Sequence, residues 1–387
     1  MPRAHAKLSA SGAHRWLACP GSVLLEEDLP DQGSPYAAEG TLAHAVGELK
    51  LRRYFDRGIG PKKFSAAMAG FRESEYWKGE MDRYTEDYFD EVKRRSLLYP
   101  EIPYVAVEER VSFEDYVPEG FGTCDCIMIY GDEMQVIDLK YGKGVVVSPE
   151  ENPQLMLYGL GALGAYEMLY GIETVRLVIV QPRLDSVEEW TISAEDLKAW
   201  GESIKETAQE AYEGSEILAS GEHCRFCKAK ARCPERGREF FSAVEEIAAA
   251  IKKKEVPWLS NADIAKYLTR AKGILDWVKD LEEEALRAVL AGETVPGYKA
   301  VEGRSNRAFK STDRALEILK GAGYEEAMLY ERKPLSLSKL EGLVGKARFK
   351  DLLGDEVVKP QGKPTLVEES DKRAPFVKDL GFQNLEK

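Results

Sequence analysis

The sequence predicts an α/β fold in which a central β-sheet is covered by helices on both faces. The first observation is a pair of apolar, strand-like segments, residues 122–130 and 133–140, which are joined at Gly131-Asp132. This dipeptide tolerates positive φ and favours a tight two-residue hairpin loop. The second observation is that both sets of alternating side chains in the hairpin are largely apolar, so both faces are expected to be covered.

Further strands and helices are expected on either side of this hairpin. Thr41 is expected to cap one helix, and Ser148 followed by Pro149 is typical of the start of another. The predicted helices cover residues 9–19, 42–55, 73–99, a segment from 148, 194–212 and 261–291, and the predicted strands cover residues 105–111, 175–183, 187–192 and 298–301.

The hairpin places two carboxylates opposite each other. With a two-residue loop, Asp125 faces Asp138 on the neighbouring strand. Opposed side chains have Cβ atoms roughly 4.5–5.5 Å apart, and like charges placed this way are destabilising. Mg²⁺ or Mn²⁺ would reverse that penalty, because these cations prefer carboxylate oxygen. Lys140 points to the same face as Asp138 because strand side chains alternate. The alternative is a chance pair of strand-end aspartates held by surface lysines or arginines.

A histidine and a glutamate in the predicted helix 42–55 are candidates for the same centre. His44 and Glu48 are four residues apart and project from one helix face. Such a pair commonly forms a local surface hydrogen bond. In the functional interpretation, His44 supplies a nitrogen ligand to the cation, and Glu48 orients the imidazole or a water molecule.

The cysteines indicate a second metal centre. A C-x2-C-x5-C array near residue 230 is one ligand short of a soft-metal site, and either Cys19 or His223 could complete it. Four cysteines favour an iron–sulfur cluster, whereas three cysteines and a histidine suit Zn²⁺. Cys124 and Cys126 are expected to pack on the strand face opposite Asp125. The array itself consists of Cys224, Cys227 and Cys233.

Composition describes an ordinary globular protein without a membrane segment. The chain has 387 residues, 44% hydrophobic and 31% charged, with six cysteines and a formal net charge of −13. This charge argues against nonspecific coating of nucleic acid but allows a local basic groove. No run of residues is long and apolar enough to span a bilayer, and no signal peptide is recognisable, so a cytoplasmic location is expected.

The metal-binding residue types end before residue 240. Residues 241–387 are expected to form a mainly helical accessory region of unknown role, with a basic loop at residues 303–307 and a poorly ordered tail from residue 359. The length favours two domains, which we place at residues 1–240 and 241–387.

These motifs together resemble the RecB-like branch of the PD-(D/E)xK nuclease superfamily, which includes CRISPR-associated relatives and the nuclease half of AddAB-type enzymes. The resemblance covers residues 8–240 and is most similar to the stand-alone nucleases of phages and prophages. One departure is Asp138, where glutamate is common in these relatives. The matching motifs are Gly40-Thr41-x-x-His44-x-x-x-Glu48, Gly122-x-x-Asp125, Asp138-x-Lys140 and Gln154-x-x-x-Tyr158, followed by the cysteine array.

The resemblance implies a restriction-endonuclease-like mixed sheet and a role for each motif residue. Lys140 would orient the attacking water or stabilise charge on the phosphate, and Gln154 and Tyr158 would position the DNA strand. A 4Fe–4S cluster would join Cys19 to the three downstream cysteines Cys224, Cys227 and Cys233. The Mg²⁺ or Mn²⁺ ligands would be His44, Asp125, Asp138 and the Leu139 carbonyl.

The expected function is that of a metal-dependent DNA nuclease, specifically an exonuclease that processes DNA ends in phage recombination or replication. Its partners would be single-stranded or duplex DNA ends, with a phage single-strand-binding or recombination protein and a second copy of the chain as further candidates. The alternative is a DNA-binding or assembly protein that keeps the fold but cleaves little. A zinc-stabilised structural protein is the third hypothesis.

Overall fold

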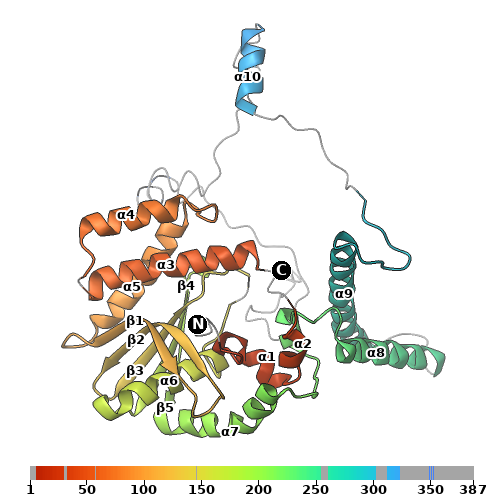
Figure 1. The fold of residues 1–387 in the computed structure, drawn as a ribbon, viewed down its shortest axis with the longest axis horizontal. Helices are drawn as coiled ribbons and strands as arrows, with labels where there is room; N and C mark the ends of the chain where they lie inside the picture. Colours follow the sequence, from red (N-terminus) through yellow and green to blue (C-terminus); the bar gives the residue numbers. More distant parts are fainter. Residues whose placement is uncertain are drawn as a thin grey trace, which may run out of the picture. The chain divides into compact units, whose positions relative to one another are not determined.

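A five-stranded mixed sheet in the order β1-β2-β3-β4-β5 lies at the centre of the fold (Figure 1). The computed structural model describes residues 6–29, 33–56, 58–144, 146–253, 260–301 and 312–322, together with residues 348, 350 and 352. β3 and β4 are parallel and are connected through helix α6, whereas the other neighbouring pairs are antiparallel. The strands are β1 Tyr104–Ser112, β2 Phe121–Tyr130, β3 Glu133–Leu139, β4 Thr174–Gln181 and β5 Ser186–Ser193.

Helices cover both faces of the sheet, as the sequence predicts for an α/β protein. Helices α3 and α5 lie over one face, and α6 and α7 over the other (Figure 1). The helices are η1 Ala10–Gly12, α1 Ala13–Ala18, α2 Ser22–Glu26, α3 Pro35–Phe55, α4 Pro61–Arg72, α5 Met81–Ser96, α6 Pro153–Tyr170, η2 Pro182–Leu184, α7 Ala194–Glu213, η3 Glu222–Phe226, α8 Pro234–Lys253, α9 Asn261–Leu290 and α10 Thr312–Gly321.

Two helices begin at other caps than the sequence suggests. Helix α3 begins before Thr41, because the Ser34 side chain accepts a hydrogen bond from the Ala37 amide and a proline follows the cap. Helix α6 is capped by Asn152, four residues after Ser148. The helix predicted for residues 73–99 is shorter, since α5 begins at Met81, and the described residues 298–301 form no strand.

The predicted hairpin register is confirmed. Five rungs from Tyr130↔Glu133 to Cys126↔Ile137 have the expected pairing. Gly131 has a φ of 60°, as in a type II′ turn with glycine at its first central position. The next rung would pair Asp125 with Asp138, but there the Leu139 amide donates to the Asp125 carboxylate at 2.7 Å.

The regular alternation of side chains breaks at one rung of the β1–β2 pair. In β2, Cys124 packs on the α6 side of the sheet and Cys126 on the α3–α5 side, although residues two apart normally share a face. In β1, Val107 and Val111 are likewise on opposite sides. The expectation that both cysteines share the face opposite Asp125 is therefore wrong.

The chain divides into two units, Met1–Val301 and Glu302–Lys387, later than the boundary expected at residue 240. Helix α9 belongs to the first unit and contacts the cysteine array through an Arg232–Glu284 ion pair and the segment after the array through an Arg236–Asp280 ion pair. The predicted loop at residues 303–307 and the tail from residue 359 lie outside the described residues. Within the described part of the chain, no helix combines the length and apolarity needed to cross a bilayer.

Candidate metal centre

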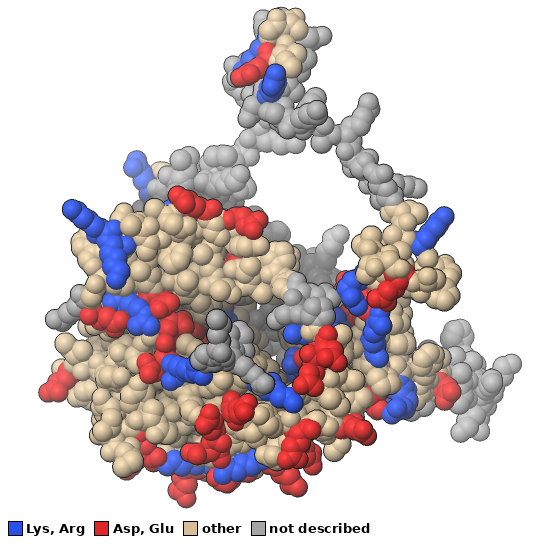
Figure 2. Space-filling model, viewed as in Figure 1, with Lys and Arg blue, Asp and Glu red and all other residues tan. Residues whose placement is uncertain are grey.

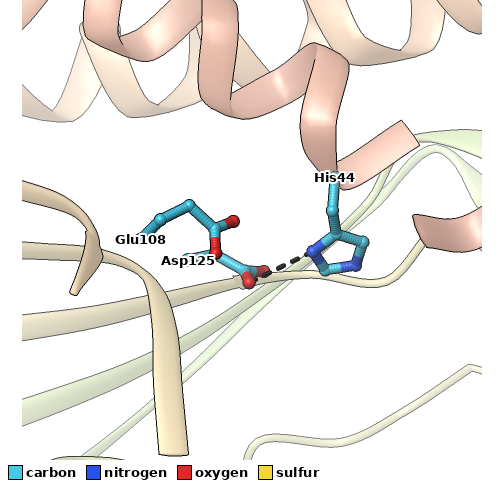
Figure 3. A group of neighbouring side chains, drawn as sticks. All are labelled: His44, Glu108 and Asp125. Atoms are coloured by element: carbon cyan, nitrogen blue, oxygen red, sulfur yellow. Dashed lines mark hydrogen bonds and ion pairs between the residues drawn. The ribbon is translucent and has the colours of Figure 1, made fainter. Parts of the chain in front are cut away.

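His44 and Asp125 meet between helix α3 and strand β2 (Figure 3). The His44 Nδ1 atom lies 3.1 Å from Asp125 Oδ1. The other oxygen, Oδ2, accepts the hydrogen bond from the Leu139 amide of β3. The carboxylate of Asp125 is therefore shared between a helix on one side and the neighbouring strand on the other.

Glu108 of strand β1 is a third member of this group (Figure 3). It lies between the Val107↔Cys126 and Glu109↔Cys124 rungs, at the position opposite Asp125. One nitrogen or oxygen atom from each of His44, Glu108 and Asp125 lies within 4.8 Å of the other two. The φ of Glu108 is 49°, a left-handed conformation that is uncommon for a residue other than glycine.

Glu108 was not singled out from the sequence, although a signal was present. Glu108 and Glu109 are adjacent in a strand expected to be covered on both faces. Because successive strand side chains point to opposite faces and both faces are covered, each of the two glutamates would point toward a packed layer. An inward glutamate is unusual unless it is paired or holds a metal ion.

Asp138 and Lys140 lie together at the end of strand β3. The Lys140 ammonium is 2.9 Å from Asp138 Oδ2 and donates a 2.9 Å hydrogen bond to Gln154 of α6. The Gln154 amide donates back to Asp138 Oδ1 at 3.4 Å. Lysine and carboxylate therefore share one face, as the strand alternation predicts, and Gln154 joins them to helix α6.

Tyr158 and Glu48 have contacts that differ from their expected roles. Tyr158 is 8% exposed, and its ring is so close to Gly122 that an added Cβ there would lie 2.6 Å from it. Such a ring has no face open to a nucleic-acid base, and its hydroxyl instead accepts a hydrogen bond from Gln154. Glu48 accepts a 2.7 Å hydrogen bond from Arg52, whereas the His44 imidazole is oriented by Asp125.

The charges at this centre shift the titration of its members. The pKa of His44 is raised to about 9: burial by itself would lower it, but the adjacent Asp125 carboxylate outweighs burial. Burial and then the charge of Asp125 raise the pKa of Glu108 to about 7. Burial also raises the pKa of Asp138, as does Asp125, and Lys140 opposes this increase. Three carboxylates thus compete for the positive charge of two side chains.

A buried tyrosine hydroxyl lies beside the same carboxylates. Tyr88 of α5 is 1% exposed, and its hydroxyl makes no hydrogen bond within the part of the chain that the structure describes. Burial, followed by the charges of Asp125, Cys126, Asp138 and Glu108, raises the pKa of Tyr88 well above its ordinary value of 10. A buried hydroxyl without a partner is uncommon in folded proteins.

Helix η3, which contains Cys224, packs against the N-terminal helix α1. The Cys19 sulfur accepts a 3.4 Å hydrogen bond from the Ala219 amide, and the Cys224 sulfur lies 4.0 Å from the Ala219 carbonyl oxygen. Burial raises the pKa of Cys19, and the nearby thiols of Cys224 and Cys233 raise it further. Thiols about two hundred residues apart are thereby brought to one place.

Cys227 is attached to the same N-terminal segment through an acidic residue. Burial and the neighbouring Glu26 carboxylate raise the pKa of the Cys227 thiol to about 12. Glu26 also pairs with Arg15 at 2.7 Å and accepts a hydrogen bond from the Lys228 amide. His223, the alternative fourth ligand, instead has its Nε2 atom 2.9 Å from the Ala219 carbonyl oxygen.

The fold and these two clusters define the class of protein: an α/β protein with a five-stranded mixed sheet and a candidate cation site of histidine and carboxylates. The chain belongs to the family described as "Protein of unknown function (DUF2800)", which matches residues 5–374. A solved structure titled "Crystal structure of SSO0001" matches at 17% sequence identity and a TM-score of 0.26, over 53% of this chain and 98% of that chain.

Proposed function

We propose that this protein is a DNA exonuclease that depends on Mg²⁺ or Mn²⁺ and has the restriction-endonuclease-like fold. The observation that carries the proposal is the convergence of His44, Asp125, Asp138 and Lys140 at one end of the central hairpin. Carboxylate oxygens and one imidazole nitrogen are suitable ligands for these cations. A purely structural core has no need of opposed carboxylates next to a lysine.

The donor set fits a divalent cation. His44, Asp125 and Asp138 would hold it, with the Leu139 carbonyl as a further predicted ligand. The cation, when bound, would polarise the phosphodiester and make a water molecule more acidic. The Asp125 carboxylate is already fixed by the His44 imidazole and the Leu139 amide, so little reorientation is needed.

Lys140 is placed to act on the phosphate itself. Its ammonium is held between Asp138 and Gln154, so its position is restricted before any substrate binds. A positive charge fixed in this way would stabilise the negative charge that develops on the phosphate oxygens. Gln154 would position Lys140 rather than contact a base, because its amide already bonds Asp138 and Tyr158.

The proposed substrate is DNA ends, and the charge distribution is compatible with local contacts to phosphate. The formal net charge is −13, and on the face seen in Figure 2 acidic and basic side chains are interspersed. Recognition of a long duplex by this face is therefore not expected. The enzyme would act in DNA recombination or replication, with a single-strand-binding protein as a candidate partner.

We assign the cysteine centre to a 4Fe–4S cluster with a structural role. Four cysteine ligands favour an iron–sulfur cluster, because such clusters are held by Cys₄ sites. Such a cluster would join the N-terminal helices to the segment before α8.

Cleavage of end-labelled DNA tests the proposed function. Linear and circular DNA are incubated with the protein and Mg²⁺ or Mn²⁺, and the proposal expects loss of linear DNA only. Asp138→Asn should abolish the reaction, and Asp132→Asn in the hairpin turn is the matched control that should not. Absence of cation-dependent loss of either DNA, with Asp138→Asn indistinguishable from the wild type, would refute nuclease activity. Retained DNA binding would then favour an assembly role.

Anaerobic purification tests the cluster separately. Protein with the cluster should be brown and contain about four iron atoms per chain. Colourless protein with one zinc ion per chain would instead indicate the zinc-stabilised alternative.

A further inference from the structure

Helix α9 has one side that is packed against helix α8 (Figure 1). The ring centroids of Trp277 and Phe240 lie 5.4 Å apart, and a Cβ added at Gly273 would lie 3.0 Å from the Phe240 ring. On the same side Asp280 forms an ion pair with Arg236 of α8. The three positions of α9 are separated by four and three residues, so they lie on one face of the helix, which α8 covers.

The opposite side of α9 carries an exposed apolar stripe. A residue two positions from Trp277 is rotated by about 200° around the helix, and Leu275 is accordingly exposed. The members of the stripe are separated by four, seven, three, eight and four residues, which are sums of the steps that keep side chains on one helix face. Their exposed fractions run from 40% to 72%. They are Ile264, Leu268, Leu275, Val278, Leu286 and Leu290.

The length of this stripe distinguishes it from scattered surface leucines. It runs from Ile264 to Leu290, which is about 40 Å along the axis of an α-helix. Single exposed apolar residues are common on protein surfaces, whereas a continuous apolar patch marks an interaction site. The stripe is therefore expected to be covered by another helix or surface of similar length.

The apolar ends of the stripe are arranged symmetrically about position 277. Ile264 and Leu290 are each thirteen residues from this midpoint, and Leu268 and Leu286 are each nine residues from it. When two copies of α9 lie antiparallel and are centred on the midpoint, Ile264 of one copy is level with Leu290 of the other. Leu268 is likewise level with Leu286. A twofold contact requires a patch that is complementary to itself, and this stripe has that property.

Two charged residues on the same face follow the same symmetry. Lys272 and Glu282 are exposed and lie five residues before and after the midpoint. In the antiparallel pair, Lys272 of each copy is level with Glu282 of the other, so opposite charges meet twice. A parallel pair would place like charges level with each other. Within one helix the two residues are about 15 Å apart along the axis, so their complementarity exists only between copies.

We propose that the exposed stripe of α9 is a dimer interface, occupied by the antiparallel α9 of a second copy of this chain. A different partner protein would have to supply a matching apolar and charged stripe, whereas this helix already contains both halves. Side chains spaced by three and four residues allow the two helices to interdigitate. The proposal concerns α9 alone and does not depend on the proposed nuclease function.

Sedimentation equilibrium of the full-length protein tests the proposal. The wild type should associate reversibly to twice the chain mass of 43.3 kDa. Leu275→Glu should raise the dissociation constant about 100-fold or more, because it buries carboxylates close to the twofold axis. Thr269→Glu adds the same charge to an exposed position on another side of α9. It is the matched control and should dimerise as the wild type does.

Exchange of the two charges tests the orientation of the helices. Lys272→Glu alone and Glu282→Lys alone should each raise the dissociation constant about tenfold, because two attractive contacts become repulsive. The double variant should recover most of the wild-type affinity, because opposite charges meet again. Should Leu275→Glu not fold, this exchange still decides, since it leaves the apolar residues unchanged.

Three results would overturn the proposal. The first is a wild type that stays monomeric at its highest soluble concentration, and slow hydrogen exchange of α9 in that monomer would mean that another segment of the same chain covers the stripe. The second is a dimer that Leu275→Glu does not weaken. The third is a failure of the double charge variant to recover the affinity that either single variant loses.

Discussion

The protonated His44 is expected to make the cation-free protein less stable as the pH rises. The pKa of His44 is about 9 in the folded protein and 6.5 in an unfolded chain. Because the folded-state pKa is the higher one, the ion pair with Asp125 stabilises the fold fully below pH 6.5. This stabilisation is lost as the pH rises through about 9.

The magnitude follows from the same two values. At about 1.36 kcal/mol per pKa unit, the difference corresponds to about 3.4 kcal/mol. One third of the His44 side chain is exposed, so solvent screening reduces this contribution to about 2 kcal/mol. Glu108 changes stability in the same direction, but mainly between pH 4.5 and about 7. The range from pH 7 to 9.5 therefore reports chiefly on His44.

Urea unfolding in the presence of a chelator measures this effect. The free energy of unfolding is compared at pH 7 and 9.5 for the wild type and for His44→Gln, which cannot carry the charge. The wild type should lose about 1.5–2 kcal/mol more than the variant. Comparing the two proteins cancels the contribution of cysteine thiols, which also ionise in this range. Parallel losses in both proteins would refute a charged His44–Asp125 pair.

The same proton should leave when a cation binds. At pH 8 most molecules carry the His44 proton, and an imidazole must lose it to become a ligand. Calorimetric titration with Mn²⁺ in two buffers of different ionisation enthalpy should show release of about one proton from this residue. Its release should disappear in His44→Gln, and unchanged release would mean that His44 is not a ligand.

Four other substitutions test three separate parts of the structure. Lys140→Met should lower the cleavage rate about 100-fold or more and leave Mn²⁺ binding intact, and a rate within a few-fold of wild type would contradict its role. Cys19→Ser should lose iron and visible absorbance and lower the unfolding midpoint, so normal iron content would exclude it as a ligand. Gly161→Ala should lower the free energy of unfolding by about 1–3 kcal/mol, because the new Cβ would lie 2.9 Å from Val111. Gly164→Ala should raise the free energy of unfolding by about 0.5–1 kcal/mol, because a Cβ at Gly164 would have no other atom within 4 Å and alanine favours the helix. Similar changes in unfolding free energy for the two glycines would contradict this packing.

The hairpin could be predicted from the sequence because local chemistry determines it. Gly131 permits the tight turn, and the turn then fixes which residues of β2 and β3 face each other. Lys140 follows from the same periodicity, since it is two residues from Asp138. The prediction that Cys19 lies near the distant cysteine array depended instead on counting possible metal ligands. In the structure the sulfur atoms of Cys19 and Cys224 both contact the backbone of Ala219.

Glu108 and the helix starts could not be predicted in the same way. A loop of eight residues separates β1 from β2, so no turn rule fixes which of their residues face each other. The residue types in Val107-Glu108-Glu109 also do not predict the positive φ of Glu108. The helix starts failed for another reason. Three dipeptides carry the same local signal for a helix start, a capping residue followed by proline, and only tertiary packing decides which of them begin helices. They are Ser34-Pro35, Ser148-Pro149 and Asn152-Pro153.

The three carboxylates are difficult to explain as structural features alone. Without a cation, His44 balances Asp125 and Lys140 balances Asp138. The pKa of Glu108 is nevertheless raised to about 7, because burial and the charge of Asp125 outweigh the opposing charges of His44 and Arg52. The left-handed backbone conformation of Glu108 lowers the free energy of unfolding by about 1–3 kcal/mol more, as expected for such strain. A protein selected only for stability would replace at least one of these acids with an apolar residue, because burying like charges is unfavourable. A cationic ligand is the one explanation that uses all three acids together, since each would then contribute oxygen atoms where positive charge is bound.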